Sequence, residues 1–317
     1  MNIIYTVCNR TNLTHALALA NSVAEHQPDH TFYLCWVDTY PIVGLPPHIN
    51  VLSVTEANVP QWEFMKNQYI DFELLAACRP WFALTLVAKY SDCRQITFFA
   101  PTVILLKGFS EILNSSSTAF LTPNIVKPLA ASAILDDKRI LNIGMFHAGS
   151  WILNTNPTNV KVLQWWAERT VDRAKFDLCE GMNMDQLWLN YLPIWVPETS
   201  VVRHPGWHYG LHEVLNRKLT FENGKYFVDG AALISIDFAG LSYFDPIWSD
   251  YVALLSSNRV FKNFFAEYKN TLKKYGGLKH SDYRPGFGKT IHVKRFRLFR
   301  NNIAKTLKSL SVYIDQF

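Results

Sequence analysis

The stretch QITFFAPTVILL, residues 95–106, is an apolar run that is interrupted at Ala100, Pro101 and Thr102. Phenylalanine and β-branched residues fill its first half, so a buried β-strand is predicted at 95–99. The proline that follows predicts a turn directly at the carboxyl end of that strand. Ala100, Pro101 and Thr102 should therefore lie at the edge of a sheet where this strand ends.

The chain before this stretch alternates strands with helices. Short β-rich runs occupy 3–8, 31–37 and 50–54, and apolar residues recur at helical spacing after the first of them. A long helix is predicted at 72–90, broken or kinked near Pro80. This alternation predicts an α/β fold, a Rossmann-like mixed sheet flanked by helices. Ligands of such sheets bind beyond the carboxyl ends of the strands.

The second half of the chain does not continue this alternation of strands and helices. Strands are predicted at 150–154 and 232–237, and helices at 159–173 and 184–191. Pro193 should end the second of these helices. Asn223-Gly224 separates two short β-rich runs and predicts a hairpin with a type I′ turn.

The composition fits a globular protein. Of the 317 residues, 49% are hydrophobic and only 18% are charged, which provides ample apolar area for a core. The five cysteines are odd in number and never form a CxxC pair, so we expect reduced thiols in a cytoplasmic compartment, not disulfides or a zinc site. Neither a signal peptide nor an 18-residue apolar span is evident, so secretion and membrane crossing are not expected.

The net charge of +5 is unevenly distributed. Residues 257–317 carry 14 Lys or Arg and 3 Asp or Glu, a net of +11, which leaves −6 on 1–256. In the tail, apolar residues recur at helical spacing among basic ones, from Val293 to Leu310. This pattern predicts a helix that lies on an anionic membrane surface. The alternative is a helix that packs on the body with a solvated basic face. Nucleic acid is not an expected partner, because no stacking or base-reading motif is present.

Several segments, in order, resemble those of nucleotide-sugar glycosyltransferases with the GT-A fold, and the chain is similar to a bacterial member of glycosyltransferase family 8. The segments are LLAACRPWF (74–82), ITFFAPTVILL (96–106), NIG with the following strand (142–144 and 148–154), NMDQ (183–186), HPGWHYG (204–210) and IDFAG (236–240). The resemblance covers roughly residues 1–275. It implies a GT-A catalytic domain over 1–256, with a nucleotide-binding half at 1–110 and an acceptor-binding half at 111–256. A basic helical extension would occupy 257–317.

This resemblance implies a hexosyltransferase-like enzyme that moves a sugar from a nucleotide-sugar donor to a glycan or lipid-linked acceptor. The expected pathway is bacterial surface polysaccharide synthesis, of lipopolysaccharide or capsule. The expected location is the cytoplasm, peripherally associated with the inner face of the membrane. The competing interpretation is a catalytically silent relative that binds a nucleotide, a sugar or a protein partner.

One departure from the family concerns its metal. The family holds a divalent cation with an Asp-x-Asp motif and a closing histidine, and these positions are here Ala100, Pro101, Thr102 and Asp237. A hard cation needs several anionic or carbonyl oxygens, and one carboxylate remains. We therefore expect no metal and no other cofactor. Fixed cations would stabilise the leaving diphosphate instead, with Arg79, Arg203, His204 and Lys289 as candidates.

The resemblance also assigns donor contacts. The base and ribose would be seated by Thr6, Val7, Cys8, Asn9 and Asp38, and the rest of the donor by Arg79, Ala100, Pro101, Thr102 and Asn154. Asp38 could equally cap a turn or helix. The alternative for Arg79 is a surface pair with Glu73 or Asp71.

Asp185 and Gln186 are the principal catalytic candidates. The resemblance places Asp185 on the hydroxyls of the donor sugar and Gln186 near the anomeric carbon. The alternative for Asp185 is a helix N-cap. Family 8 enzymes retain the anomeric configuration. Inversion would instead need a general base, and Asp237, Glu213 and His208 are the candidates.

Acceptor binding is assigned to the loop that contains His204, Trp207, His208 and Glu213. Sugars stack their CH faces on aromatic rings, so Trp207 is a candidate platform, with ordinary packing as the alternative. Three imidazoles at 204, 208 and 212 could bind metal only on a helix, which Pro205-Gly206 argues against.

Overall fold

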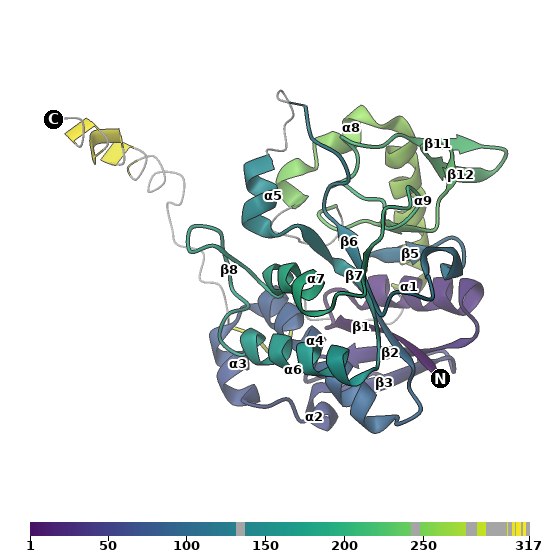
Figure 1. Cartoon of the computed structure of the whole chain (residues 1–317), viewed down its shortest axis with the longest axis vertical. Coiled ribbons are helices and arrows are strands. Elements are labelled where there is room, and N and C mark those ends of the chain that lie inside the picture. The colour runs from purple at the N-terminus through teal and green to yellow at the C-terminus, as the bar shows by residue number, and fades with distance from the viewer. Residues whose placement is uncertain are drawn as a thin grey trace.

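The computed structural model describes residues 1–130, 137–241, 248–276 and 284–289, together with 303, 306–307, 309–311 and 313–314. A seven-stranded sheet forms its centre, in the order β10-β6-β7-β4-β1-β2-β3. Helices α4 and α6 lie on one side of this sheet, and α1 and α9 lie on the other (Figure 1). The predicted α/β class, a mixed sheet flanked by helices, is confirmed.

The first four strands of the sheet are parallel, as the alternation of elements predicts. They are β1 (Asn2–Cys8), β2 (His30–Trp36), β3 (Ile49–Ser53) and β4 (Gln95–Phe99). The residues of β1, β2 and β4 are almost entirely buried, since helices cover both faces, whereas the edge strand β3 exposes Asn50 and Val51. The carboxyl ends of β1, β2 and β4 therefore share one edge of the sheet.

Strand β7 (Phe146–Asn154) runs antiparallel to both β4 and β6 (Ala119–Pro123), and β10 (Thr199–Val201) completes the sheet. In this register Ser150 pairs with Phe99, whereas Asn154 pairs with Gln95 at the opposite end of β4. The Asn154 side chain accepts a hydrogen bond from Gln95 Nε2 at 3.2 Å. The prediction that Asn154 contacts the donor is therefore wrong, and the first residues of β7 lie at the binding edge instead.

Helix α4 (Asp71–Lys89) runs through Pro80 without a break. Residues on both sides of the proline are buried, among them Cys78 and Phe82, and α4 packs against α6 (Pro157–Thr170). Packing thus offsets the hydrogen bond that proline cannot make. Pro193 also departs from expectation, because it lies in the first turn of α7 (Leu192–Trp195), where its missing N–H costs nothing.

A second cluster of buried residues joins α1 (Leu13–His26) to α9 (Arg259–Tyr275). Nδ1 of His15 lies 2.6 Å from the Tyr268 hydroxyl, and Asn21 Nδ2 donates to the Tyr275 hydroxyl at 2.6 Å. Helix α9, which follows the boundary predicted at 257, therefore packs on the body.

The hairpin β11 (Leu219–Glu222) and β12 (Lys225–Val228) is confirmed, with φ positive at both Asn223 and Gly224, as a type I′ turn requires. The strand expected at 232–237 is divided into β13 (Ala231–Ala232) and β14 (Ser235–Asp237). Strand β14 pairs antiparallel with β5 (Val103–Leu105), and this pairing sets Asp237 opposite Val103.

The remaining elements are short and connect the larger ones. The helices are α2 (Val54–Ala57), α3 (Trp62–Gln68), α5 (Asp137–Ile143) and α8 (Leu254–Ser257), the strands are β8 (Phe176–Asp177) and β9 (Met182–Asn183), and the 3-10 turns are η1 (Ser110–Ile112), η2 (Gln186–Tyr191) and η3 (Trp248–Tyr251).

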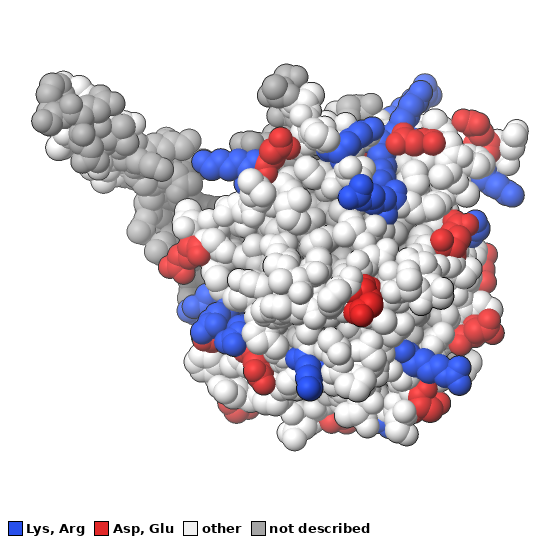
Figure 2. All heavy atoms as spheres, viewed as in Figure 1, with Lys and Arg blue, Asp and Glu red and all other residues white. Residues whose placement is uncertain are grey.

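On the face shown in Figure 2, charged side chains lie mainly toward the rim, and the centre is largely uncharged. Helical residues of the C-terminal tail are exposed, including Ile303, Leu307 and Leu310. The basic residues from 294 to 300 lie outside the described residues. Within the described part of the chain, no helix combines the length and apolarity needed to cross a bilayer.

Candidate active site

One small pocket of about 50 Å³ collects residues from five of the segments singled out in the sequence. It lies at the carboxyl end of β4 and the start of β7. Its lining comprises Arg79, Ala100, Pro101, Thr102, His147, Ala148, Gly149, Met184, Asp185, Gln186, Asp237 and Ala239. Segments up to 160 residues apart in the chain thus meet where the turn after β4 was expected to gather functional residues.

A buried ion pair forms one wall of this pocket. Arg79 Nη1 lies 3.0 and 3.3 Å from the two carboxylate oxygens of Asp185. The Asp185 side chain is fully buried, and that of Arg79 is 18% exposed. Burial raises the pKa of Asp185, and the Arg79 guanidinium opposes that rise.

This pairing replaces both alternatives weighed for the two residues. Asp185 directs its carboxylate at Arg79 and not at the backbone N–H groups of η2. Glu73, the alternative partner of Arg79, instead accepts hydrogen bonds from the N–H groups of Ile70 and Phe176. The sequence could not distinguish these pairings, because Arg79 and Asp185 are 106 positions apart.

The Gln186 amide connects two parts of the pocket. Its Oε1 accepts a hydrogen bond from the N–H of Ala148, and its Nε2 donates to the carbonyl of Ile143, both at 2.9 Å. Gln186 thereby holds the start of β7 against η2. The structure brings it to the pocket as predicted, with its amide engaged in these contacts.

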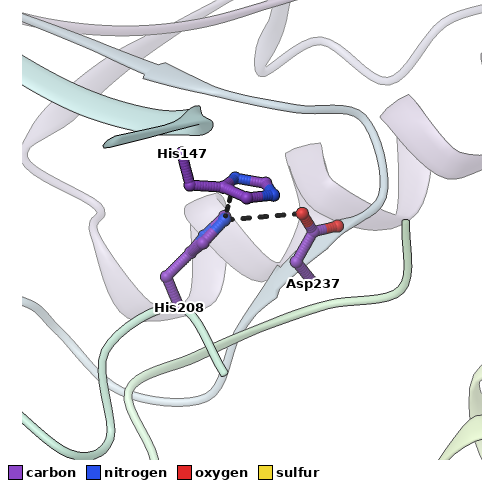
Figure 3. A group of neighbouring side chains, drawn as sticks. All are labelled: His147, His208 and Asp237. Atoms are coloured by element: carbon purple, nitrogen blue, oxygen red, sulfur yellow. Dashed lines mark hydrogen bonds and ion pairs between the residues drawn. The ribbon is translucent and has the colours of Figure 1, made fainter. Parts of the chain in front are cut away.

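A second wall contains His147 and Asp237, and His208 lies behind them, in contact with both; all three are buried (Figure 3). His208 Nε2 lies 3.0 Å from His147 Nδ1 and 3.4 Å from Asp237 Oδ2. The other carboxylate oxygen of Asp237 accepts hydrogen bonds from Thr102 Oγ1 at 2.6 Å and from the N–H of Ala239 at 2.9 Å.

Burial and charge set the protonation of this wall. Burial, helped by His208, lowers the pKa of His147 to about 3, so this imidazole is neutral at pH 7. Burial by itself raises the pKa of Asp237, but polar contacts from His208 and Thr102 outweigh it and hold the pKa well below its usual value. Asp237 is therefore ionised beside a neutral imidazole.

Two residues next to these walls have left-handed backbone. Met184 precedes Asp185 and has φ of 47°, and His208 has φ of 51°. Such a conformation costs a non-glycine residue about 1–2 kcal/mol and persists where the surroundings enforce it. Met184 lines the pocket next to Asp185, and His208 lies beside His147 and Asp237.

Four other residues predicted to contact phosphate or acceptor lie outside the pocket lining. Trp207 is buried and donates its indole N–H to Thr122 Oγ1 at 2.8 Å, so the interpretation as a sugar platform is wrong and that of ordinary packing is confirmed. Glu213 is buried against Arg217, with Nε and Oε2 3.2 Å apart. His204 Nε2 lies 3.5 Å from Glu111, and Lys289 is an exposed residue whose N–H donates to the carbonyl of Tyr69.

Arg203 lines a different pocket, of about 290 Å³, with Pro123, Ile125, Val126, Met145, Phe146, Asn190 and Val201. Phe146 of this pocket and His147 of the smaller pocket are neighbours in β7. Arg203 is therefore not placed on the wall that contains Arg79, and its surroundings are largely apolar.

The positions predicted for the base and ribose are buried. Thr6, Val7, Cys8 and Asn9 are each at most 2% exposed. Asp38 forms an ion pair with Arg10 and accepts a hydrogen bond from the N–H of Gly286 at 3.1 Å. The segment Arg284–Lys289 thus lies over this end of the sheet. Only Lys289 of this segment was predicted to contribute, and Arg10 was not predicted.

His147 is the main residue that sequence reasoning missed. It stands one position before Ala148, at the amino end of a strand that was expected to begin at 150. The signal was the longer apolar run FHAGSWILN, which an antiparallel strand directs with its amino end toward the site. His208 was proposed as an acceptor ligand or base and lies beside Asp237 instead.

The positions that hold a divalent cation in the resembled family do not fit a hard cation here. Ala100 offers no side-chain oxygen, and the Thr102 hydroxyl already donates to Asp237. A magnesium-like ion would find one carboxylate among these positions.

Comparison with known proteins finds distant similarities. No family model matches the chain. A Bacillus subtilis (strain 168) protein, the uncharacterized protein YfnD, is 22% identical over 245 residues, which cover 75% of this chain and 77% of that protein.

Among solved structures, the galactosyltransferase LgtC in complex with donor and acceptor sugar analogues is 12% identical over 82% of this chain and 96% of its own, with a TM-score of 0.44. An active-site mutant of LgtC is 11% identical over 81% and 96%, with a TM-score of 0.45. A glycosyltransferase involved in glycosylation of the major capsid of PBCV-1 is 7% identical over 74% and 91%, with a TM-score of 0.42.

Proposed function

We propose that the protein is a glycosyltransferase that moves a sugar from a nucleotide-sugar to a glycan or lipid-linked acceptor. The observation that supports this most strongly is the convergence of separate motifs. Arg79, the turn at Ala100–Thr102, the start of β7, Asp185-Gln186 and Asp237 line a single pocket. Each of these segments resembles a glycosyltransferase motif in its sequence alone.

In this proposal Arg79 stabilises the diphosphate that leaves. It is the cation of the pocket lining, and its guanidinium can pair with two phosphate oxygens at once. Asp185 holds the guanidinium in place and can accept hydrogen bonds from hydroxyls of the donor sugar. Preorganised charge of this kind lowers the barrier without rearrangement during the reaction.

The size of the pocket limits what can enter it. A cavity of about 50 Å³ is far smaller than the roughly 300–1,000 Å³ of typical ligand pockets. The reacting end of the donor would occupy it, and the nucleotide would need neighbouring loops to move. The segment Arg284–Lys289, which lies over Asp38 at the end of β2, is one such loop.

We place the acceptor in the pocket of about 290 Å³ that Arg203 lines. Its apolar lining with Arg203 and Asn190 suits a sugar that has both CH faces and hydroxyls. The resemblance favours retention of configuration. Asp237, which is ionised and lies beside His208, is the base that an inverting reaction would use.

We further propose that the reaction does not depend on Mg²⁺ or Mn²⁺, because the Asp-x-Asp carboxylates are replaced. The pathway would be bacterial surface polysaccharide synthesis at the inner face of the membrane. A lipid-linked acceptor would then meet the enzyme through the basic tail, whose described residues Ile303, Leu307 and Leu310 are exposed.

The membrane proposal predicts that deletion of residues 290–317 releases the protein from anionic liposomes at low salt. Each basic residue near such a surface contributes about 1 kcal/mol, and this segment holds six of the tail's 14 basic residues, from Lys294 to Lys308. Co-sedimentation with phosphatidylserine vesicles measures the effect, and neutral vesicles are the control. Unchanged co-sedimentation of the truncated protein would contradict the proposal.

Binding of nucleotides tests the donor site. Isothermal titration with UDP, GDP, ADP, CDP and dTDP should find one diphosphate that binds, and Arg79→Gln should weaken it at least about tenfold through loss of a charged hydrogen bond. The matched control is Arg173→Gln, since Arg173 is 47% exposed beside Asp172. If no diphosphate binds, the silent relative becomes the better account.

A further inference from the structure

The three side chains of Figure 3 come from β7, the loop between β10 and β11, and the end of β14. They are the group of potential metal ligands that the described residues contain, and their ligand atoms all lie within 4.8 Å of one another. We propose that His147, His208 and Asp237 bind a divalent transition-metal cation of the zinc class. This is a cation where the sequence predicted none, held by residues other than the Asp-x-Asp positions.

The separations suit a shared cation. Ligand bonds of about 2.1 Å at tetrahedral angles set neighbouring ligand atoms about 3.4 Å apart. His208 Nε2 is 3.4 Å from Asp237 Oδ2 and 3.0 Å from His147 Nδ1. Small movements of these side chains would therefore enclose an ion.

Hydrogen bonds alone leave this group incomplete. His208 Nε2 carries at most one hydrogen, yet it faces both His147 Nδ1 and Asp237 Oδ2. Within the described residues, Asp237 Oδ2 has no hydrogen-bond partner, although it is buried. A buried carboxylate oxygen without a partner is costly, and a cation would complete it.

The surroundings hold the carboxylate in the orientation that a ligand needs. Thr102 Oγ1 and the N–H of Ala239 both donate to Oδ1 of Asp237, so Oδ2 is left facing the histidines. Such outer hydrogen bonds orient metal ligands. The N–H of Gly149 now donates to His147 Nδ1 at 2.9 Å, and this bond would yield when the cation binds.

The ligand types select the class of metal. Two imidazoles and one carboxylate suit Zn²⁺ and its neighbours, whereas Mg²⁺ prefers an octahedron of oxygens. Three protein ligands leave a further position for an oxygen from water or substrate, on the side where Arg79 lines the same pocket. A role for this ion in glycosyl transfer rests on the proposed function, but its binding does not.

Metal binding is tested on the full-length protein, stripped with a chelator and dialysed against Zn²⁺, Co²⁺ or Mg²⁺ without nucleotide. We expect about one Zn²⁺ or Co²⁺ per chain by elemental analysis, and no retained Mg²⁺. Bound Co²⁺ should show the visible bands of nitrogen and oxygen ligands without thiolate charge transfer. Thiolate bands would place the ion on cysteines and overturn the proposal, as would a failure to retain Zn²⁺.

Variants identify the ligands. His208→Gln and Asp237→Asn should weaken Zn²⁺ binding at least about a hundredfold, and Thr102→Val, which removes an outer hydrogen bond, about tenfold to a hundredfold. His204→Gln is the matched control from the same loop and should bind as wild type. Circular dichroism shows whether each variant is folded, and Thr102→Val remains informative if a ligand variant is not.

Wild-type affinity in folded ligand variants would overturn the site. Because no nucleotide is present, the two proposals fail separately. If the protein binds zinc but transfers no sugar, the metal site stands and the proposed function is wrong. If it transfers sugar but retains no zinc, the proposed function stands and the metal site is wrong.

Discussion

Arg79→Met should lower the free energy of unfolding by about 3–5 kcal/mol at pH 7, the usual cost of leaving a buried charge without its partner. Asp185 is fully buried and has both oxygens within 3.3 Å of Arg79 Nη1. Without the guanidinium, its carboxylate has neither water nor an opposite charge to stabilise it. Urea unfolding of the wild type and the variant measures the difference.

The stability that Arg79→Met loses relative to wild type should become smaller as the pH falls. Burial raises the pKa of Asp185 in the folded protein above its unfolded value, and Arg79 limits that rise. A raised carboxyl pKa gives stability that is present below the unfolded pKa and is lost as pH rises through the folded pKa. In Arg79→Met the pKa rises further, so the deficit relative to wild type should shrink between pH 7 and pH 5.

Two further variants make this prediction specific. Arg79→Met with Asp185→Asn removes both charges and should recover at least about 1 kcal/mol of the loss at pH 7. Arg173→Met, at an exposed arginine, should change stability by no more than about 0.5 kcal/mol. A deficit in Arg79→Met as small as that of Arg173→Met would show that the buried pair is not formed.

Asp185→Asn should reduce kcat/KM for the donor by about a hundredfold to a thousandfold, the usual effect of removing one preorganised polar group from an active site. The amide is nearly isosteric with the carboxylate but cannot hold the Arg79 guanidinium by charge. It also changes a group proposed to contact the donor sugar. Release of nucleoside diphosphate, followed by chromatography, gives the rates.

The control for this variant is Asp172→Asn, because Asp172 is 50% exposed and lies outside the pocket. It should leave kcat/KM within about twofold of wild type, as a surface substitution does. If Asp185→Asn were equally active, the Arg79 and Asp185 wall would have no part in the reaction.

The positions of β1 to β4 in the sequence and their parallel direction could be predicted, because each is a short apolar run with turn or helix signals around it, whereas their order in the sheet was not predicted. Those signals are local. They also placed Ala100 and Thr102 at the carboxyl end of β4, where the structure has them.

The direction of β7 could not be predicted, because it depends on pairing with β4 and β6, which are distant in the chain. This one unknown accounts for two errors. Asn154 was assigned to the donor although it lies at the far end of the sheet, and His147 was overlooked although it lies in the pocket.

The burial of Trp207 and Glu213 could not be predicted from the residues next to them in the sequence either. An aromatic residue in a polar loop looks available for stacking, but Trp207 packs between Phe99 and Phe109, from two other segments. Glu213 forms an ion pair with Arg217, four residues later in the chain. Burial by residues distant in sequence decides such cases.

The central claim, that this pocket transfers a sugar from a nucleotide-sugar, is tested most directly by measuring nucleoside diphosphate release from a panel of nucleotide-sugars. Wild type and Asp185→Asn are compared side by side, each supplied with zinc. We predict release from one donor by the wild type, faster with acceptor and about a hundredfold to a thousandfold slower in the variant. Absence of release from every donor, or equal release by the two proteins, would contradict the claim.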